Sequence, residues 1–214
     1  MTQEKKNQLL KSLLIYKSFG IKYHEEISFS KNSFIDKEHL PSDISSLESY
    51  VKNCTLCELS KHSNMEPLFG IGNVNSDVYV IGTNFGFLDN NLNNILKNMV
   101  QNVLMIDFKN IYMTNIIKCE SNGSNLDSFV NICKDYLIKQ IEINKPKYII
   151  TIGDSFNYMM DNNSQIVDVS GNVYDFMDSK LIPMLDLNFV YKNPSYKQDM
   201  FTDLQKIKTL MEQE

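Results

Sequence analysis

The sequence predicts an α/β fold, a three-layer α/β/α sandwich with a central, mostly parallel four-stranded sheet. Short runs of β-branched and aromatic residues recur along the chain, and longer segments with apolar residues at helical spacing separate them. This alternation is typical of parallel sheets that are covered by helices on both faces. The hydrophobic content of 43% supports a buried core, and 214 residues are enough for one such domain with a modest extension.

The predicted strands are apolar along their whole length, as strands buried on both faces usually are. They cover residues 77–82, 111–115, 147–153 and 181–185. Helices are predicted over residues 44–52, 91–103, 126–143, 154–160 and 197–211. Asp154 is expected to cap the helix that follows the third strand. Ligands of such sheets bind at the carboxyl ends of the strands, so the informative segments are 82–89, 114–119, 153–155 and 186–192.

Residues 1–43 are predicted to be an N-terminal extension, and residues 44–214 the main domain. The extension has apolar residues at roughly helical spacing, which indicates an amphipathic helix: Leu9, Leu10, Leu13, Leu14 and Tyr16. Lysines interrupt this stretch and no small-residue cleavage site follows it, so a secretion signal is not predicted. The helix either packs on the domain or binds a protein partner, and the sequence leaves both interpretations open.

Composition limits the environment and the partners. No apolar run reaches the roughly 18 residues of a membrane helix, so we expect a cytoplasmic protein without membrane contact, and we expect a monomer. All 21 basic residues are lysines, so phosphate contacts must use point charges or backbone N–H groups. The net charge of −5 argues against broad, sequence-independent binding of nucleic acid and leaves room only for a local basic patch.

Four cysteines, Cys54, Cys57, Cys119 and Cys133, are candidate ligands of a metal or a cluster. Disulfides are disfavoured in a reducing cytoplasm, whereas zinc and [4Fe–4S] clusters both accept four cysteines. Most structural zinc sites pair two short C-x-x-C motifs, and here only Cys54 and Cys57 form one. The spacing therefore favours a cluster weakly, and by itself leaves iron and zinc open.

Several motifs occur together in one order. They are Cys54-Thr55-Leu56-Cys57-Glu58-Leu59, the segment Gly70–Asn73, Tyr112-Met113-Thr114-Asn115-Ile116-Ile117-Lys118-Cys119, the stretch Cys133–Lys147, and Ile152-Gly153. From about Leu47 to Leu210 the chain resembles the iron–sulfur (family 4) uracil-DNA glycosylases, whose motifs include C-x-x-C-x-L and Y-x-T-N-x-x-K-C. The resemblance implies an α/β/α sandwich, a [4Fe–4S] cluster on the four cysteines, and excision of uracil from DNA in base excision repair.

The resemblance also implies roles for residues around the first two strand ends. Asn115 matches the amide that reads uracil. The family motif G-E-x-P-G appears here as Gly82-Thr83-Asn84-Phe85-Gly86, so Thr83 stands at the acidic catalytic position. Asp89 is a candidate substitute for that acid. The loop that follows is shortened, and Phe85 or Phe87 is expected to supply the ring that stacks on uracil beside Gly82.

The family motif H-P-x-x-L-L-R-N-P corresponds to residues 186–194. Lys192 and Asn193 match it, and with Ser195 they are predicted to contact DNA. Asp186 stands at the position of the catalytic histidine. An ionised Asp186 would repel the anionic base as it leaves, by about 4 kcal/mol at ~4 Å and an effective dielectric of ~20. This repulsion disappears only if an apolar pocket keeps the carboxyl protonated.

Three hypotheses follow. The chain is a uracil-DNA glycosylase with an altered catalytic shell, a protein of that fold that binds nucleic acid or a partner without excising uracil, or an unrelated zinc protein of α/β fold. Excision of uracil in an assay separates the first from the second, and the bound metal separates the third.

Overall fold

The computed structural model describes residues 40–63, 65–84, 90–121 and 126–213. All of them belong to one compact unit. The N-terminal helix predicted within residues 1–39 lies outside the described residues, and the division of the chain after residue 43 stays a prediction. In the described part of the chain, no helix is both long and apolar enough to cross a membrane.

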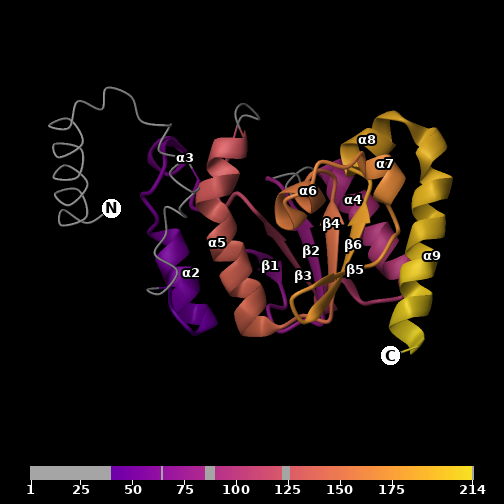
Figure 1. Ribbon diagram of the computed structural model, residues 1–214, viewed down its shortest axis with the longest axis horizontal. Helices are drawn as coiled ribbons and strands as arrows, with labels where there is room; N and C mark the ends of the chain where they lie inside the picture. Colours follow the sequence, from indigo (N-terminus) through magenta and orange to yellow (C-terminus); the bar gives the residue numbers. More distant parts are fainter. Residues whose placement is uncertain (1–39, 64, 85–89, 122–125, 214) are drawn as a thin grey trace, which may run out of the picture. The chain divides into compact units, whose positions relative to one another are not determined.

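A six-stranded sheet with the order β1-β3-β2-β4-β6-β5 forms the centre of the unit (Figure 1). Its four inner strands are parallel and coincide with the four predicted ones: β2 (Val78–Gly82), β3 (Ile111–Asn115), β4 (Tyr148–Ile152) and β6 (Ser179–Met184). The two edge strands β1 (Ile71–Gly72) and β5 (Tyr174–Phe176) are antiparallel to their neighbours. The α/β fold class is therefore confirmed, and the sheet has two more strands than expected.

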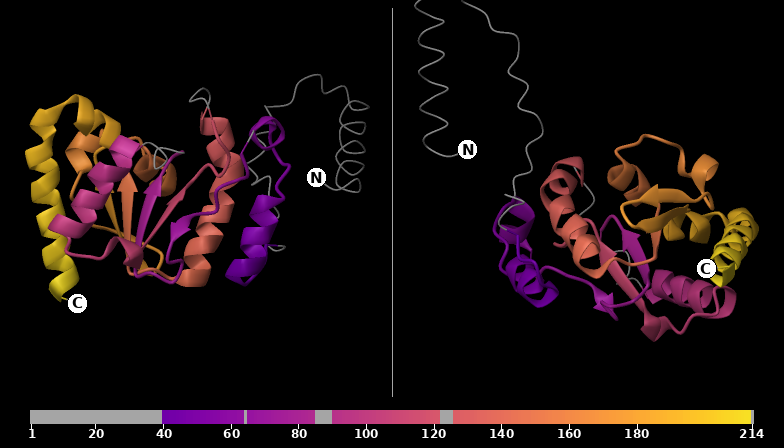
Figure 2. Two further views of the ribbon diagram at one scale, coloured as in Figure 1. Left: turned by 180° about the vertical axis from the view of Figure 1, so that it is seen from behind. Right: turned by 60° about the horizontal axis from the view of Figure 1, so that its bottom comes forward.

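One face of the sheet is covered by helices α4 (Asn90–Asn98), α8 (Leu187–Lys192) and α9 (Lys197–Gln213). The α4 helix continues into one π-helical turn, Met99–Val103. Alternate strand residues such as Val80, Ile150 and Ile182 pack against Leu96 and Leu204 in the core of this layer. Figure 2 shows α4 and α9 together on this side of the sheet.

The other face is covered by α5 (Leu126–Asn144) and α6 (Ser155–Met160). Strand residues of opposite parity, among them Tyr79, Ile81 and Ile149, pack there against Leu137 and Phe156. Helix α2 (Ile44–Lys52) lies against the outer side of α5, where Leu47 and Val51 pack with Tyr136 (Figure 1). The three layers are thus those predicted, with α2 added beyond one of them.

Several short elements were not predicted. They are α3 (Glu58–His62), α7 (Ile166–Val169), and the 3-10 turns Phe108–Asn110 and Pro194–Tyr196. Helix α8 was not predicted either, and it begins directly after Asp186, in a segment for which the sequence predicted site residues. These pieces of three to six residues are too short to show a hydrophobic period.

Candidate active site and four-cysteine centre

A cavity of about 510 Å³ lies at the carboxyl ends of β2, β4 and β6, where ligands of parallel sheets bind. Gly82 and Thr83 line it from β2, Gly153 and Asp154 from β4, and Asp186 from β6. The described residues of its lining include two carboxylates and no lysine or histidine. The described lining is therefore polar with a negative charge.

Asn115 ends β3 and is paired in register with Gly82, which lines the cavity. Its side chain is fully buried, and neither its Oδ1 nor its Nδ2 has a hydrogen-bond partner among the described residues. The backbone around it is fixed, since Ile116 N–H donates to the Gly82 carbonyl at 2.9 Å and Ile117 N–H to the Thr83 carbonyl at 3.0 Å. A buried amide without partners costs about 1–3 kcal/mol per unsatisfied group, so its presence suggests a ligand that satisfies it.

Asp186 lines the cavity and also stabilises a helix. It is the N-cap of α8, and its Oδ1 accepts a hydrogen bond from Phe189 N–H at 2.9 Å. The residue is exposed and therefore is not enclosed in an apolar pocket. The hydrogen bond from Phe189 N–H stabilises the start of α8.

Asp154 follows a sharp turn at Gly153, whose φ is +60°. It occupies the N-cap position of α6, but its side chain makes no capping hydrogen bond, so the predicted capping role is wrong. The next residue, Ser155, is fully buried, and its hydroxyl donates to the carbonyl oxygens of Ile81 and Ile152, both at 2.9 Å. The backbone that carries Asp154 is therefore anchored to β2 and β4, while its carboxylate remains exposed at the cavity.

The cavity lining also contains polar groups that are already paired. Tyr158 donates a hydrogen bond to Asp127 Oδ1 at 2.7 Å. Partial burial, and then this acceptor, raise the pKa of Tyr158 to about 12. Asn157 holds the following loop through Ser164, whose carbonyl oxygen accepts from Asn157 Nδ2 at 2.9 Å. These groups shape the wall, and their polar atoms are engaged within the protein.

The four cysteines come from three separate segments and are free thiols. Cys54 and Cys57 precede α3, Cys119 follows β3, and Cys133 lies within α5. Burial raises the pKa of Cys119 to about 12, and the charges of the other three cysteines act in the same direction. Burial also raises the pKa of Cys133, to about 11. The four thiols therefore lie near enough to influence one another electrostatically.

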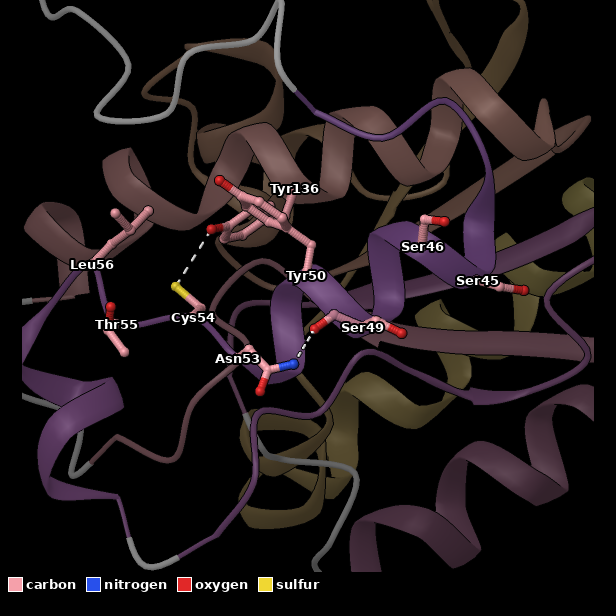
Figure 3. Close-up of a pocket in the computed structure, with 9 residues that line it drawn as sticks. All are labelled: Ser45, Ser46, Ser49, Tyr50, Asn53, Cys54, Thr55, Leu56 and Tyr136. Carbon is pink, nitrogen blue, oxygen red and sulfur yellow. Dashed lines mark hydrogen bonds between the residues drawn. The ribbon is translucent and has the colours of Figure 1, made fainter.

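Among the described residues, no three His, Cys, Asp or Glu side chains form a group that could hold a metal ion. Cys54 is the least buried of the four thiols and lines an open cavity of about 660 Å³ with Tyr50 and Tyr136. In Figure 3 the Tyr136 hydroxyl points to Cys54 and donates a hydrogen bond to its Sγ at 3.4 Å. This hydrogen bond connects Cys54 to α5, the helix that also carries Cys133.

Lys118 is a fully buried lysine beside this centre. The motif contains it, but the sequence indicated no role for it. Its Nζ donates to Thr114 Oγ1 at 2.7 Å, to Gln140 Oε1 at 2.5 Å and to the Phe69 carbonyl at 3.4 Å. Burial lowers the pKa of Lys118 to about 7. The network connects β3, α5 and the segment before β1, and these are the elements that surround Cys119 and Cys133.

The predicted DNA-contacting residues are all exposed: Lys192 is the last residue of α8, and Asn193 and Ser195 lie on the turn that follows. Asn193 caps that helix, with its Nδ2 donating to the Phe189 carbonyl at 2.9 Å. Phe189 lines the cavity and packs against Tyr196, with 5.0 Å between ring centroids, so it joins the cavity to this surface. Phe85, Phe87 and Asp89, which were expected near uracil, lie outside the described residues.

Comparison with known proteins gives the family. The sequence model of the Uracil DNA glycosylase superfamily matches residues 69–206, more than half of the chain. This chain belongs to that superfamily. The match includes β2, β3, β4 and β6 and therefore the whole strand-end site, whereas Cys54 and Cys57 precede it.

Individual relatives support a divergent member of this superfamily that is similar to its type-4 branch. The chain is 28% identical to the type-4 uracil-DNA glycosylase of Sulfurisphaera tokodaii over 54% of its own length and 58% of the relative's. It is 25% identical to that of Thermotoga maritima over 77% and 92% of the two chains. It is also 24% identical to a DNA polymerase of Bacillus phage SP01, with 71% of this chain but only 18% of the polymerase in the match.

Proposed function

We propose that this chain hydrolyses the N-glycosidic bond of uracil in DNA and holds a [4Fe–4S] cluster on its four cysteines. The observation that carries the activity is Asn115, a fully buried amide at a strand end whose two polar atoms have no partner among the described residues. The edge of uracil offers both donors and acceptors, so a base that is flipped out of the DNA would satisfy this amide. The names of the type-4 relatives support the same substrate.

The cluster is supported by the chemistry and arrangement of the donors. All four are sulfur atoms, which soft metals and iron–sulfur clusters prefer. The other cysteines act on the pKa of Cys119 and of Cys133, which supports a common centre, although no three described side chains form a group that could hold one ion. A cluster of several irons needs a wider set of sulfurs than one zinc ion, whose Zn–S bonds are only ~2.3 Å long. In the proposed site the cluster serves as a structural cross-link of three segments.

The chain's own residues would then bind and orient the substrate. Asn115 would fix the base beside β3, and the exposed Lys192, Asn193 and Ser195 would hold the DNA strand. Tyr191, 54% exposed next to Lys192, and Tyr196 offer rings on which single-stranded bases could stack. DNA is thus the proposed partner. The predicted monomeric state and a protein partner for residues 1–43 remain predictions.

Two observations favour the alternative, a protein that binds nucleic acid without excising uracil. Thr83 stands where the family has a carboxylate, and the exposed Asp186 opposes an anionic leaving base. A repulsion of about 4 kcal/mol between Asp186 and the leaving base would slow excision by roughly a thousandfold if nothing compensated for it.

The test is an excision assay with the full chain, purified anaerobically. Single-stranded and duplex oligonucleotides that contain one uracil are incubated with the enzyme in excess over DNA. Both free uracil and abasic sites are then quantified. We expect release above a no-enzyme control and a loss of about 10²–10³-fold in Asn115→Leu, which has a similar volume but no polar atoms. Binding of the oligonucleotides without release would support the alternative. Iron and sulfide analysis tests the cluster, and bound zinc without iron would refute it.

A further inference from the structure

We propose that Asp154 is a catalytic carboxylate of this site, an inference that rests on the proposed excision of uracil. The family's acidic position on β2 is occupied by Thr83, so a carboxylate must come from elsewhere. Asp154 lines the same cavity from β4, the strand that is hydrogen-bonded to β2 on the side opposite β3. It is thus one strand away from the position where the acid was expected.

The strand order separates the charges as the reaction requires. Along the carboxyl edge of the sheet, Asn115 on β3 comes first, then Thr83 on β2, Asp154 on β4, and Asp186 on β6. Cleavage of the glycosidic bond develops negative charge on the base and positive charge on the sugar. An amide on β3 suits the base, and a carboxylate two strands away, at ~10 Å, leaves room for the base and its sugar between them.

Asp186 is less suited to this role. It lies about one strand spacing, ~5 Å, farther from Asn115 than Asp154 does. Its Oδ1 is also committed to the α8 cap, through the hydrogen bond from Phe189 N–H. Asp154 makes no capping bond to α6, while its backbone is fixed by Gly153 and by the buried hydroxyl of Ser155. A rigid backbone with a carboxylate that is not used for capping is what a positioned base needs.

The step balances as a hydrolysis. The bond between the sugar C1′ and uracil N1 breaks, and its electron pair stays on uracil. The Asp154 carboxylate stabilises the cationic sugar and accepts a proton from the water whose oxygen forms the new bond to C1′. That proton passes to solvent, and the uracil anion takes up another, so the products are free uracil and an abasic site.

Isosteric substitutions on neighbouring strand ends test this assignment. Single-turnover rates on uracil-containing single-stranded DNA are measured for the full, cofactor-loaded chain and for Asp154→Asn, Asp154→Glu, Asp186→Asn and Asp161→Asn. We expect Asp154→Asn to be slower by ~10²-fold or more. Asp154→Glu should restore part of the rate. Asp186→Asn keeps the helix cap and removes a repulsive charge, so its rate should exceed that of the wild type.

Asp161→Asn is the matched control, because it removes an exposed carboxylate from the far end of α6 that pairs with Lys134. Its rate should not change. The cofactor absorbance and the urea midpoint of each variant show whether it is folded. If the wild type releases uracil and a folded Asp154→Asn does so at a similar rate, the assignment of Asp154 is refuted while the proposed function stands. If the wild type releases none, both are refuted.

Discussion

Gly153 controls the geometry of both carboxylates in the cavity, and its replacement by alanine has a calculable cost. Its φ of +60° is in the left-handed region, which costs an alanine about 1–2 kcal/mol. An added Cβ would also lie 3.1 Å from Asp186 Cβ and 3.4 Å from its Oδ2, so Asp186 must move by a few tenths of an ångström. This movement strains the 2.9 Å cap on Phe189 N–H, and such caps contribute ~1 kcal/mol. We therefore expect Gly153→Ala to lower the free energy of unfolding by about 2–3 kcal/mol.

A double-mutant cycle in urea separates the two contributions. In the background of Asp186→Gly, where the carboxylate is absent, Gly153→Ala should cost only the backbone part of about 1–2 kcal/mol. The coupling between the two positions should thus be near 1 kcal/mol. A cost below ~0.5 kcal/mol in the wild-type background would mean that residue 153 is not left-handed. Equal costs in both backgrounds would mean that the contact with Asp186 carries no energy.

Three further predictions concern the buried network, the cavity wall and the cysteines. Gln140→Leu should lower the free energy of unfolding in urea by about 2–4 kcal/mol, because Lys118 Nζ loses the acceptor that lies 2.5 Å away. Gln140→Glu keeps an acceptor oxygen and should lower that free energy by less. The pKa of Tyr158 is raised to about 12, so folding favours its neutral phenol. The stability that this group contributes is fully present below pH 10 and is lost between pH 10 and 12. Over that interval the free energy of unfolding of Tyr158→Phe should therefore fall less than that of the wild type. Cys119 lies on the same strand-end segment as Asn115. At equal residual iron content, Cys119→Ser should therefore reduce uracil release more than Cys54→Ser does. Equal losses in the two variants would contradict a link through that segment.

The inner strands could be predicted from the sequence because each is a short, uniformly apolar run, such as Val78–Gly82 and Tyr148–Ile152. The edge strands could not, because Ile71–Gly72 and Tyr174–Phe176 are two and three residues long and are defined by their partner strands. A strand of that length has no pattern of its own. What the sequence lacked was therefore the tertiary pairing that makes such segments strands.

The candidate site was predictable in part. The segment 153–155 stood out as a strand end, and Asp154 was interpreted as a helix cap because aspartate before a helix usually is one. Only the structure shows that the side chain does not cap and lines a cavity. Lys118 belongs to the Y-x-T-N-x-x-K-C motif, but nothing in the sequence indicated its burial, since lysine is rarely buried and its place inside the protein depends on Gln140 from another segment and on Thr114.

The segment 115–119 connects the two centres of the molecule. Asn115 lies at the cavity end of β3, and Cys119 is the first cysteine after it; Ile116 and Ile117 continue the backbone pairing with β2, and Lys118 is buried between α5 and β3. A group held by Cys119 would therefore fix the direction in which the chain leaves β3, and with it the orientation of the Asn115 amide. The proposed cluster would thus hold the base-binding amide in place. The negative charge of the cavity comes from other residues, Asp154 after β4 and Asp186 after β6. Changes at the cysteines should therefore affect recognition of the base, whereas changes at Asp154 and Asp186 should affect the rate of bond cleavage.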